Sequence, residues 1–385
     1  RADNMDNNNP GGGGGVSYQI EAFNETPANT MLRDTWLGFY NTILNANIVI
    51  ERSETIAMDE AAKKQIVGQA MFLRGLSYFH LVRLWGKVPL IITPQTTAEA
   101  RANTRADSAA IYAQIISDLN NAATSLPASW PDVQKGRATS YAAQALLAKV
   151  YLWQKRYPDV QTTLKPVVDA INVKSVISLV PQTSTFPGNL KTSKDVLFAV
   201  QYLSGGVGES VHQNNRYRNQ DNGFVIMLPQ TLFESGDNRK ALVAPTGNGA
   251  RPGKFNVPAS NNETSADFPV IRCAEVMLMY AEVLNEQSIT PTTEAFAALN
   301  AVRSNAGTAT LSTSTTPTKE AFRNAVFKER RLELALECDR WFDIIRTGQA
   351  PSIYPLVPST RYIYPVPQSE IDNLNDKTGW QNPGY

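Results

Sequence analysis

Residues 138–171 read ATSYAAQALLAKVYLWQKRYPDVQTTLKPVVDAI, and this stretch decides the fold. Its small alanines alternate with large apolar side chains at helical spacing as far as residue 154, and a second helical pattern follows Tyr157-Pro158. A short turn between two such helices brings them together as an antiparallel pair, and the alanines let them pack closely. The stretch therefore predicts a helix pair of tetratricopeptide type.

Similar patterns occur on both sides of this pair. Residues 270–286, with a further helix after Pro291, predict a second pair. Residues 31–85 predict a third, in which the helix from Asp59 to Trp85 is apolar on nearly every face. A helix that is hydrophobic all round is buried all round.

Two further helices complete the helical part of the prediction. Residues 109–126 form one, and residues 318–346 form a last long helix. The apolar stripe of the last helix recurs at steps of four, three and four residues: Leu334, Cys338, Trp341 and Ile345. We therefore predict a mainly α protein built on tetratricopeptide-like helix pairs.

Residues 175–266 interrupt this pattern with many prolines and glycines and only short β-like runs such as 196–200. Loops longer than about 12–15 residues in compact domains are usually functional or disordered. We expect a large irregular insert with short β-strands, which forms the working surface together with a mobile N-terminal loop.

We predict a single domain over residues 1–385. Its predicted parts are a mobile loop region (1–30), helical repeats (31–174), the irregular insert (175–266), helical repeats with a C-terminal motif helix (267–348) and an extended C-terminal segment (349–385).

The charge balance restricts the kinds of partner. Lys and Arg total 36 and Asp and Glu total 35, so the net charge is +1, and charged residues make up only 18% of the chain. A chain this neutral has no field to attract nucleic acid or an anionic membrane surface. It also has no apolar run of 18 or more residues. A neutral partner such as a sugar fits this composition better.

Catalytic and metal-binding motifs are absent from the sequence. There is no HExxH, no GxSxG, no phosphate loop with its Gly-Lys-[Ser/Thr] and no Asp-x-Asp-x-Asp-Gly calcium pattern. The carboxylates of residues 329–340 alternate with arginines, and we interpret Arg330/Glu333 and Glu337/Arg340 as i,i+3 ion pairs. We expect no enzyme, no catalytic residue, no cofactor and no metal site.

The chain has two cysteines, Cys273 and Cys338, each inside an apolar helical pattern typical of buried positions. They lie far apart in the sequence without metal-type spacing. The sequence leaves open whether they form a disulfide.

Four blocks of sequence together carry a family resemblance. They are residues 70–90 (AMFLRGLSYFHLVRLWGKVPL), 137–152 (RATSYAAQALLAKVYL), 329–348 (ERRLELALECDRWFDIIRTG) and the ending YPVP at 364–367 with NPGY at 382–385. In this order they resemble the SusD/RagB family, over the range from about residue 30 to the last residue.

The resemblance implies a protein of the outer membrane of Bacteroides-type bacteria, exposed at the cell surface. Members of the family carry a lipid anchor, cap a SusC-type TonB-dependent transporter and capture glycans or, in the RagB branch, peptides. Helix pairs form their scaffold and loops form their site. The lipid-modified cysteine and the N-terminal region that members usually carry are not in this sequence, so anchoring is expected for a longer precursor.

Candidate ligand-binding residues combine aromatic rings, which stack on the C–H faces of sugars, with planar polar groups for the hydroxyls. The insert supplies Tyr202, His212, Asn214, Arg216, Tyr217 and Phe224. The alternative for this loop is a solvated polar segment.

A second set of candidates comes from the N-terminal region. The resemblance implies that Asp3 and Asn4 line the site, and Tyr18 lies in the same loop. Trp36 begins a helix in which its spacing equally suits a core residue, and Trp130 lies in the turn Ser129-Trp130-Pro131 as either an exposed platform or a plug.

We therefore expect a surface protein that captures an oligosaccharide or polysaccharide and delivers it to a SusC-like transporter. Two alternatives remain from the sequence: a RagB-like peptide-binding protein, or a protein-interaction scaffold that uses the concave face of its helix pairs.

Overall fold

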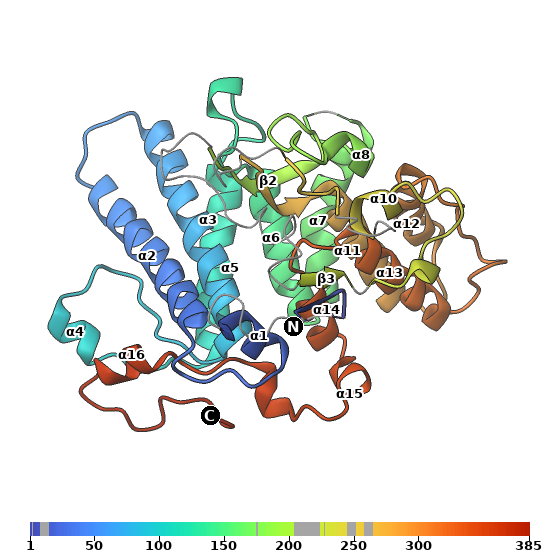
Figure 1. Ribbon diagram of the computed structural model, residues 1–385. Coiled ribbons are helices and arrows are strands. Elements are labelled where there is room, and N and C mark those ends of the chain that lie inside the picture. Colours follow the sequence, from blue (N-terminus) through green and yellow to red (C-terminus); the bar gives the residue numbers. More distant parts are fainter. Residues whose placement is uncertain are drawn as a thin grey trace. The chain divides into compact units, whose positions relative to one another are not determined.

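A computed structural model shows a mainly helical protein with two small two-stranded sheets (Figure 1), as the sequence predicts. The structure describes residues 1, 3–7, 15–174, 176–203, 224–226, 228–244, 252–257 and 265–385. The chain divides into two compact units, which are described separately. Unit 1 consists of Arg1, Asn9–Pro127 and Phe342–Tyr385, and unit 2 of Ala2–Asn8 and Ala128–Trp341. The single domain stays a prediction.

Three long helices form the centre of unit 1 (Figure 1): α2 (Thr30–Ser53), α3 (Glu60–Trp85) and α5 (Ser108–Ser125). Helix α3 packs against both α2 and α5, which explains why its sequence is apolar on nearly every face. Asp59 caps its first turn by accepting a hydrogen bond from the Ala62 N–H at 2.8 Å. Gly86 ends it with a φ of +71°, a conformation that favours glycine.

Two glycines let α3 approach α5 closely. A Cβ on Gly68 would lie 2.9 Å from the Ser125 Cβ, and a Cβ on Gly75 would lie 3.1 Å from the Leu119 side chain. The α3–α5 contact therefore leaves no room for a side chain at residue 68, and at residue 75 a Cβ would fit only if Leu119 moved by a few tenths of an ångström.

The end of the chain closes onto the C-terminal end of α3. The Trp85 indole N–H donates to the Pro365 carbonyl at 2.9 Å, and the Tyr364 N–H donates to the Leu84 carbonyl at 2.7 Å. The buried Asn382 amide donates to the carbonyls of Trp85 at 2.9 Å and Tyr364 at 2.7 Å. These bonds join sequence blocks that lie almost 300 residues apart.

The terminal segments contain more regular structure than predicted. The expected N-terminal loop includes strand β1 (Met5–Asn7) and helix α1 (Val16–Glu21). The remaining short elements of unit 1 are α4 (Thr97–Arg101), α15 (Ala350–Ile353), η5 (Ser359–Tyr362) and α16 (Gln368–Asp372).

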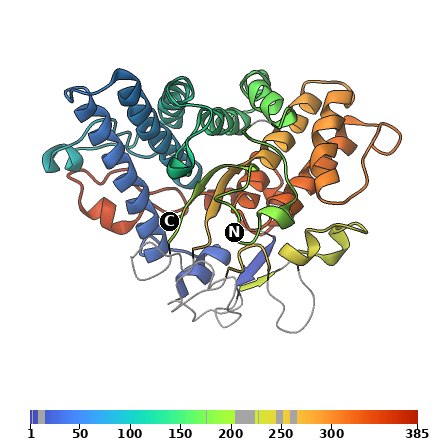
Figure 2. The same cartoon turned by 90° about the horizontal axis from the view of Figure 1, so that it is seen from above.

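Unit 2 contains two of the three helix pairs that the sequence predicts. The first is α6 (Ser140–Trp153) with α7 (Tyr157–Asn172), and the second is α11 (Cys273–Glu286) with α12 (Thr293–Asn305). Helix α11 also contacts α7 and α13 (Lys319–Glu333), so it is buried on almost every side (Figure 2).

The second pair begins later than predicted, because residues Phe268–Arg272 form strand β4. This strand pairs antiparallel with β2 (Val196–Val200). Asp195 then starts α11, since its carbonyl accepts from the Cys273 N–H at 2.7 Å and its carboxylate from the Ala274 N–H at 3.3 Å.

The predicted long helix 318–346 is wrong, because α13 ends at Glu333 and α14 begins at Arg340. The Lys254 ammonium donates to the carbonyls of Glu333 and Ala335, both at 3.0 Å, and so satisfies acceptors that a continuous helix would use itself. Leu336 and Cys338 then adopt positive φ angles of 69° and 67°.

The same break changes the environment of the cysteines. Cys338 is exposed, not buried as predicted, whereas Cys273 is buried as predicted. Both are free thiols, so they form no disulfide.

The insert is anchored by its own apolar cluster. Phe186, Leu228, Leu242 and Phe255 of the insert pack with three residues at and just after the end of α13, Leu332, Ala335 and Leu336. Its remaining short elements in the described ranges are α8 (Gln182–Thr185), β3 (Phe224–Ile226), η4 (Gln230–Leu232) and α10 (Lys240–Val243), and η2 (Asp132–Gln134) precedes α6.

Candidate binding site

A two-stranded sheet in unit 2 joins the two segments from which the sequence predicts a site. Strand β1 pairs antiparallel with β3, with Met5 opposite Ile226, Asp6 opposite Val225 and Asn7 opposite Phe224. Figure 2 shows the two strands side by side. The N-terminal segment is thereby fixed next to the end of the 202–224 loop.

Asp3 and Asn4 anchor β1 just before it begins. The Asp3 carboxylate accepts from Arg340 Nε at 2.7 Å and from Arg340 Nη2 at 2.8 Å, a bidentate pair. Arg331 Nη2 lies 3.0 Å from the same carboxylate, and Arg331 Nε donates to the Asn4 side-chain oxygen at 2.8 Å. The Asn4 side chain is buried.

This arrangement determines the charge state of Asp3. Partial burial would raise the pKa of its carboxyl, but the hydrogen bond and charge of Arg340, followed by the charge of Arg331, outweigh it and hold that pKa below its ordinary value. Asp3 is therefore an anion engaged with two arginines. In this position it acts as an anchor for β1, and its oxygens are already occupied by protein donors.

The arginines that hold β1 were not among the predicted site residues. The sequence suggests that Arg340 pairs within its own helix, with Glu337, and it suggests no partner for Arg331. In the structure Arg340 pairs with Asp3, and Glu337 turns toward Lys254 at 2.5 Å and Arg272 at 2.8 Å. Glu333 likewise pairs with Arg239 and Arg272. No local sequence signal identifies partners so distant in the chain.

Tyr202 is half-buried at the start of the predicted loop. Its backbone N–H donates to the buried Asp267 carboxylate at 3.0 Å, and its carbonyl accepts from Lys191 Nζ at 3.2 Å. Burial, followed by the negative charge of Asp267, raises the pKa of the Tyr202 phenol, which therefore stays neutral at physiological pH. Tyr202 is thus a neutral aromatic group held by its backbone.

The other candidates of this loop cannot be placed. His212, Asn214, Arg216 and Tyr217 lie outside the described residues, and Phe224 is described only through its backbone pairing with Asn7. Their role in binding stays a prediction.

Tyr18 and Trp36 belong to unit 1. Tyr18 lies on α1 and is half-buried. Trp36 is 2% exposed, with its ring 5.2 Å from Trp85 in an edge-on contact and 5.1 Å from Tyr40. A ring so enclosed offers no face for a sugar, so we leave Trp36 out of the proposed site.

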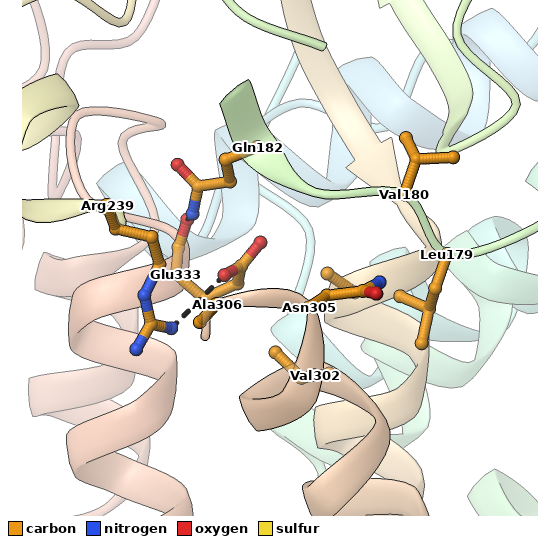
Figure 3. A pocket seen from close by; sticks show the side chains of 9 residues that line it. Leu179, Val180, Gln182, Arg239, Val302, Asn305, Ala306 and Glu333 are labelled. Carbon is orange, nitrogen blue, oxygen red and sulfur yellow. Dashed lines mark hydrogen bonds and ion pairs between the residues drawn. The ribbon is translucent and has the colours of Figure 1, made fainter. Parts of the chain in front are cut away.

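A small internal cavity in unit 2 is not a ligand site. Figure 3 shows the side chains of Gln182, Arg239 and Glu333 converging on it, with Asn305 opposite. Its volume of about 10 Å³ is about that of one water molecule's probe sphere, far too small for a sugar. The residues around it fasten the insert to α13, since Gln182 Nε2 donates to the Glu333 carbonyl at 2.8 Å.

Metal-binding clusters and membrane-spanning helices are both absent from the described residues. No group of three or more His, Cys, Asp and Glu side chains in them is arranged to hold a metal ion. Likewise, no described helix combines the length and hydropathy that a membrane-spanning segment needs.

Two family models match different parts of the chain. Residues 15–152 match a SusD-like model described as starch-binding and associating with the outer membrane, and residues 212–356 match the SusD family model. Together they cover most of the chain in the expected order. This protein belongs to the SusD/RagB family.

Curated SusD-like relatives agree with this assignment. One from Formosa agariphila is 27% identical over 97% of this chain and 85% of its own length. Another from the same organism is 25% identical over 88% of this chain and 74% of its own length.

Solved structures of the family share the whole fold. A laminarin-binding SusD-like protein superimposes with a TM-score of 0.84 at 26% identity, covering all of this chain and 92% of its own. Surface glycan-binding protein A from Bacteroides uniformis has a TM-score of 0.79 at 20% identity, over 95% of this chain and 88% of its own.

Family membership also settles the question of catalysis. The SusD/RagB family consists of non-catalytic binding proteins, so this chain is not an enzyme. The carboxylates of residues 329–340 accordingly have structural partners, as the sequence suggests, although the partners differ from those predicted.

Proposed function

We propose that this protein binds an oligosaccharide or polysaccharide at the cell surface and delivers it to a SusC-like TonB-dependent transporter. Two findings support glycan as the ligand: the starch-binding description of the matching family model, and the laminarin-binding protein that shares the fold over the whole chain. The outer-membrane description of the same model supports the location. A lipid anchor in the precursor and the transporter as partner are part of this proposal.

The observation that carries the proposed site is the β1–β3 pairing. It fixes the end of the loop that contains the aromatic and planar polar candidates, while Tyr202 is held at the loop's other end by Asp267. A loop anchored at both ends loses less conformational entropy when a ligand binds. We propose Tyr202, His212, Asn214, Arg216, Tyr217 and Phe224 as the contact residues, with Tyr18 as a further candidate.

Asp3 and Asn4 have a different proposed role. Because Arg340 and Arg331 occupy their polar atoms, we assign them to positioning β1, and through β1 the loop, instead of to direct contact with the ligand.

The test of the site is a double variant, Arg216→Ala with Tyr217→Ala. Loss of a charged hydrogen-bond donor and of a stacking ring should weaken glycan binding by about a hundredfold or more. The melting temperature should stay unchanged, because the proposal assigns both side chains to the ligand and neither to the core. The control is Leu356→Ala, which is 95% exposed and lies in unit 1. A correctly folded double variant with wild-type affinity would remove these residues from the site.

A further inference from the structure

A groove in unit 2 is lined by none of the described residues of the 202–224 loop. It lies between the turn at residues 128–139 and the segment 190–201 that includes β2. Its volume is about 400 Å³, within the range of about 300–1,000 Å³ typical of small-ligand sites. Both aromatic and polar side chains line it, among them Trp130, Arg137, Thr192, Phe198 and Gln201.

Trp130 presents a fixed ring to this groove. The residue is half-buried, and its indole N–H donates to the Ala138 carbonyl at 2.8 Å. The Arg137 guanidinium lies 5.4 Å from the ring centroid. Because the indole N–H is already bonded to the protein, the ring can offer a ligand only its apolar surface, as in stacking on a sugar ring.

Gly136 leaves room for the side-chain amide of Gln201, which lies on the opposite wall of the groove. Gly136 has a φ of +101°, and a Cβ built there would lie 2.5 Å from Gln201 Nε2 and 2.9 Å from Gln201 Oε1. The Gln201 amide can therefore lie across residue 136 only while that residue has no side chain. Within the described ranges, neither the Gln201 amide nor the Arg137 guanidinium has a hydrogen-bonding partner.

We propose that this groove is a second carbohydrate-binding subsite that takes pyranose units. The indole would stack on the C–H face of a ring, and the Gln201 amide and Arg137 guanidinium would bind its hydroxyls. Lys135 of this groove pairs with Asp132 at 2.7 Å, so its charge is already compensated within the protein. The inference rests on the proposed glycan-binding function and extends it.

The position of the groove suits a long ligand. Gln201 directly precedes Tyr202, the first residue of the proposed loop site, so the two sites border each other along the chain. A polysaccharide that occupies both binds more tightly than a short oligosaccharide that occupies only one, because the second contact is intramolecular.

The first test follows Trp130 directly. The full chain is labelled with 5-fluorotryptophan, and the Trp130 fluorine resonance is assigned as the signal missing from Trp130→Phe. A laminarin-type glucan and the other glycans of a binding panel are titrated while calorimetry records total binding. We expect the Trp130 resonance to shift saturably with a bound glycan, whereas the resonance of fully buried Trp85 does not.

Variants provide the second test. Trp130→Ala should weaken polysaccharide binding by about five- to tenfold. Gly136→Ala, which displaces the Gln201 amide, should also weaken it. Val133→Ala is the matched control, since Val133 lies in the same turn, is 93% exposed and does not line the groove.

The outcomes separate the two proposals. Calorimetric binding of a glycan with no change at Trp130 would overturn the subsite and leave the proposed function standing. A Trp130 shift with peptides but not with glycans would also overturn the subsite. If no glycan binds at all, the proposed function and the subsite both fall.

Discussion

At the scale of single residues, Asp3 links the start of the chain to the far end of α13. Its carboxylate contacts two arginines that lie more than 320 positions away in the sequence. The contact is partly buried, so each ion pair contributes more than a fully exposed one would. Since β1 follows directly, the energy of this contact holds β3 and the end of the loop in place.

Asp3→Asn tests this anchor. The amide keeps the shape but loses the charge, so the free energy of unfolding should fall by about 1 kcal/mol and glycan affinity by about three- to tenfold. Chemical denaturation and calorimetry measure the two effects. Asp34→Asn, which breaks an exposed pair with Arg33, is the control and should change neither. An unchanged affinity in Asp3→Asn would show that β1 does not position the loop.

The two tryptophans show what the sequence can resolve at this scale. Trp36 lies at helical spacing and is buried, whereas Trp130 lies in a proline-flanked turn and lines a groove. The helical spacing of Trp36 does not distinguish a core residue from a ligand-binding residue, because an amphipathic stripe does not reveal what packs against it. The edge-on contact with Trp85, 49 positions later in the sequence, identifies Trp36 as a core residue.

At the scale of elements, glycine sets the packing distance between α3 and α5. Gly68 and Gly75 face α5 closely, whereas a Cβ on Gly38 of α2 would meet nothing within 4 Å. The intrinsic preference of a helix for alanine is the same at all three positions. The difference in packing therefore predicts opposite effects for the same substitution.

Gly68→Ala should lower the free energy of unfolding by about 1–3 kcal/mol, because the methyl group collides with the Ser125 Cβ. Gly38→Ala should raise it by up to about 1 kcal/mol, because only helix propensity changes. Urea denaturation of the two variants beside the wild type measures both. If Gly68→Ala stabilised the protein instead, helices α3 and α5 would be able to move apart at no cost in free energy.

A buried ion network joins the insert to α13. Burial would raise the pKa of Glu333, but Arg272, Arg239 and Lys254 outweigh it and lower that pKa from 4.5 to about 2. A folded-state pKa below the unfolded one means that this carboxylate stabilises the protein fully above pH 4.5. Its contribution is lost as the pH falls toward 2.

Glu333→Gln should therefore lower the free energy of unfolding at pH 7 by about 3 kcal/mol. This difference in unfolding free energy between variant and wild type should become smaller as the pH falls from 4.5 toward 2, because the wild-type carboxyl becomes protonated. Denaturation curves at pH 7, 5, 4 and 3 measure the trend, with Glu60→Gln in the exposed Lys63 pair as the control. If the loss of unfolding free energy in Glu333→Gln did not depend on pH, the variant would have a packing defect, and the charge of Glu333 would not contribute to stability.

The elements that the sequence predicts well are those whose signal is local. The pairs α6–α7 and α11–α12 follow from periodicity and turn residues within about 35 positions. The break after Glu333 does not, because Lys254 causes it from 79 positions away. The β1–β3 pairing likewise joins segments more than 200 residues apart, so no local sequence pattern predicts it.

At the scale of the whole molecule, each compact unit is assembled from segments distant in the sequence. Unit 1 combines the beginning and the end of the chain, and unit 2 takes in Ala2–Asn8 beside Ala128–Trp341. The chain segments 364–367 and 382–385 close unit 1 through Trp85 and Asn382. The family blocks are thus largely scaffold, whereas the proposed ligand contacts lie in loops.

The central claim is that this scaffold presents a glycan-binding surface. The most direct measurement is binding of the purified chain to a panel of plant, host and microbial polysaccharides by calorimetry and affinity gel, with a casein digest beside them. We predict saturable binding to at least one polysaccharide, which is recovered intact, and none to the peptides. Binding to peptides alone would contradict the claim and indicate a RagB-like protein.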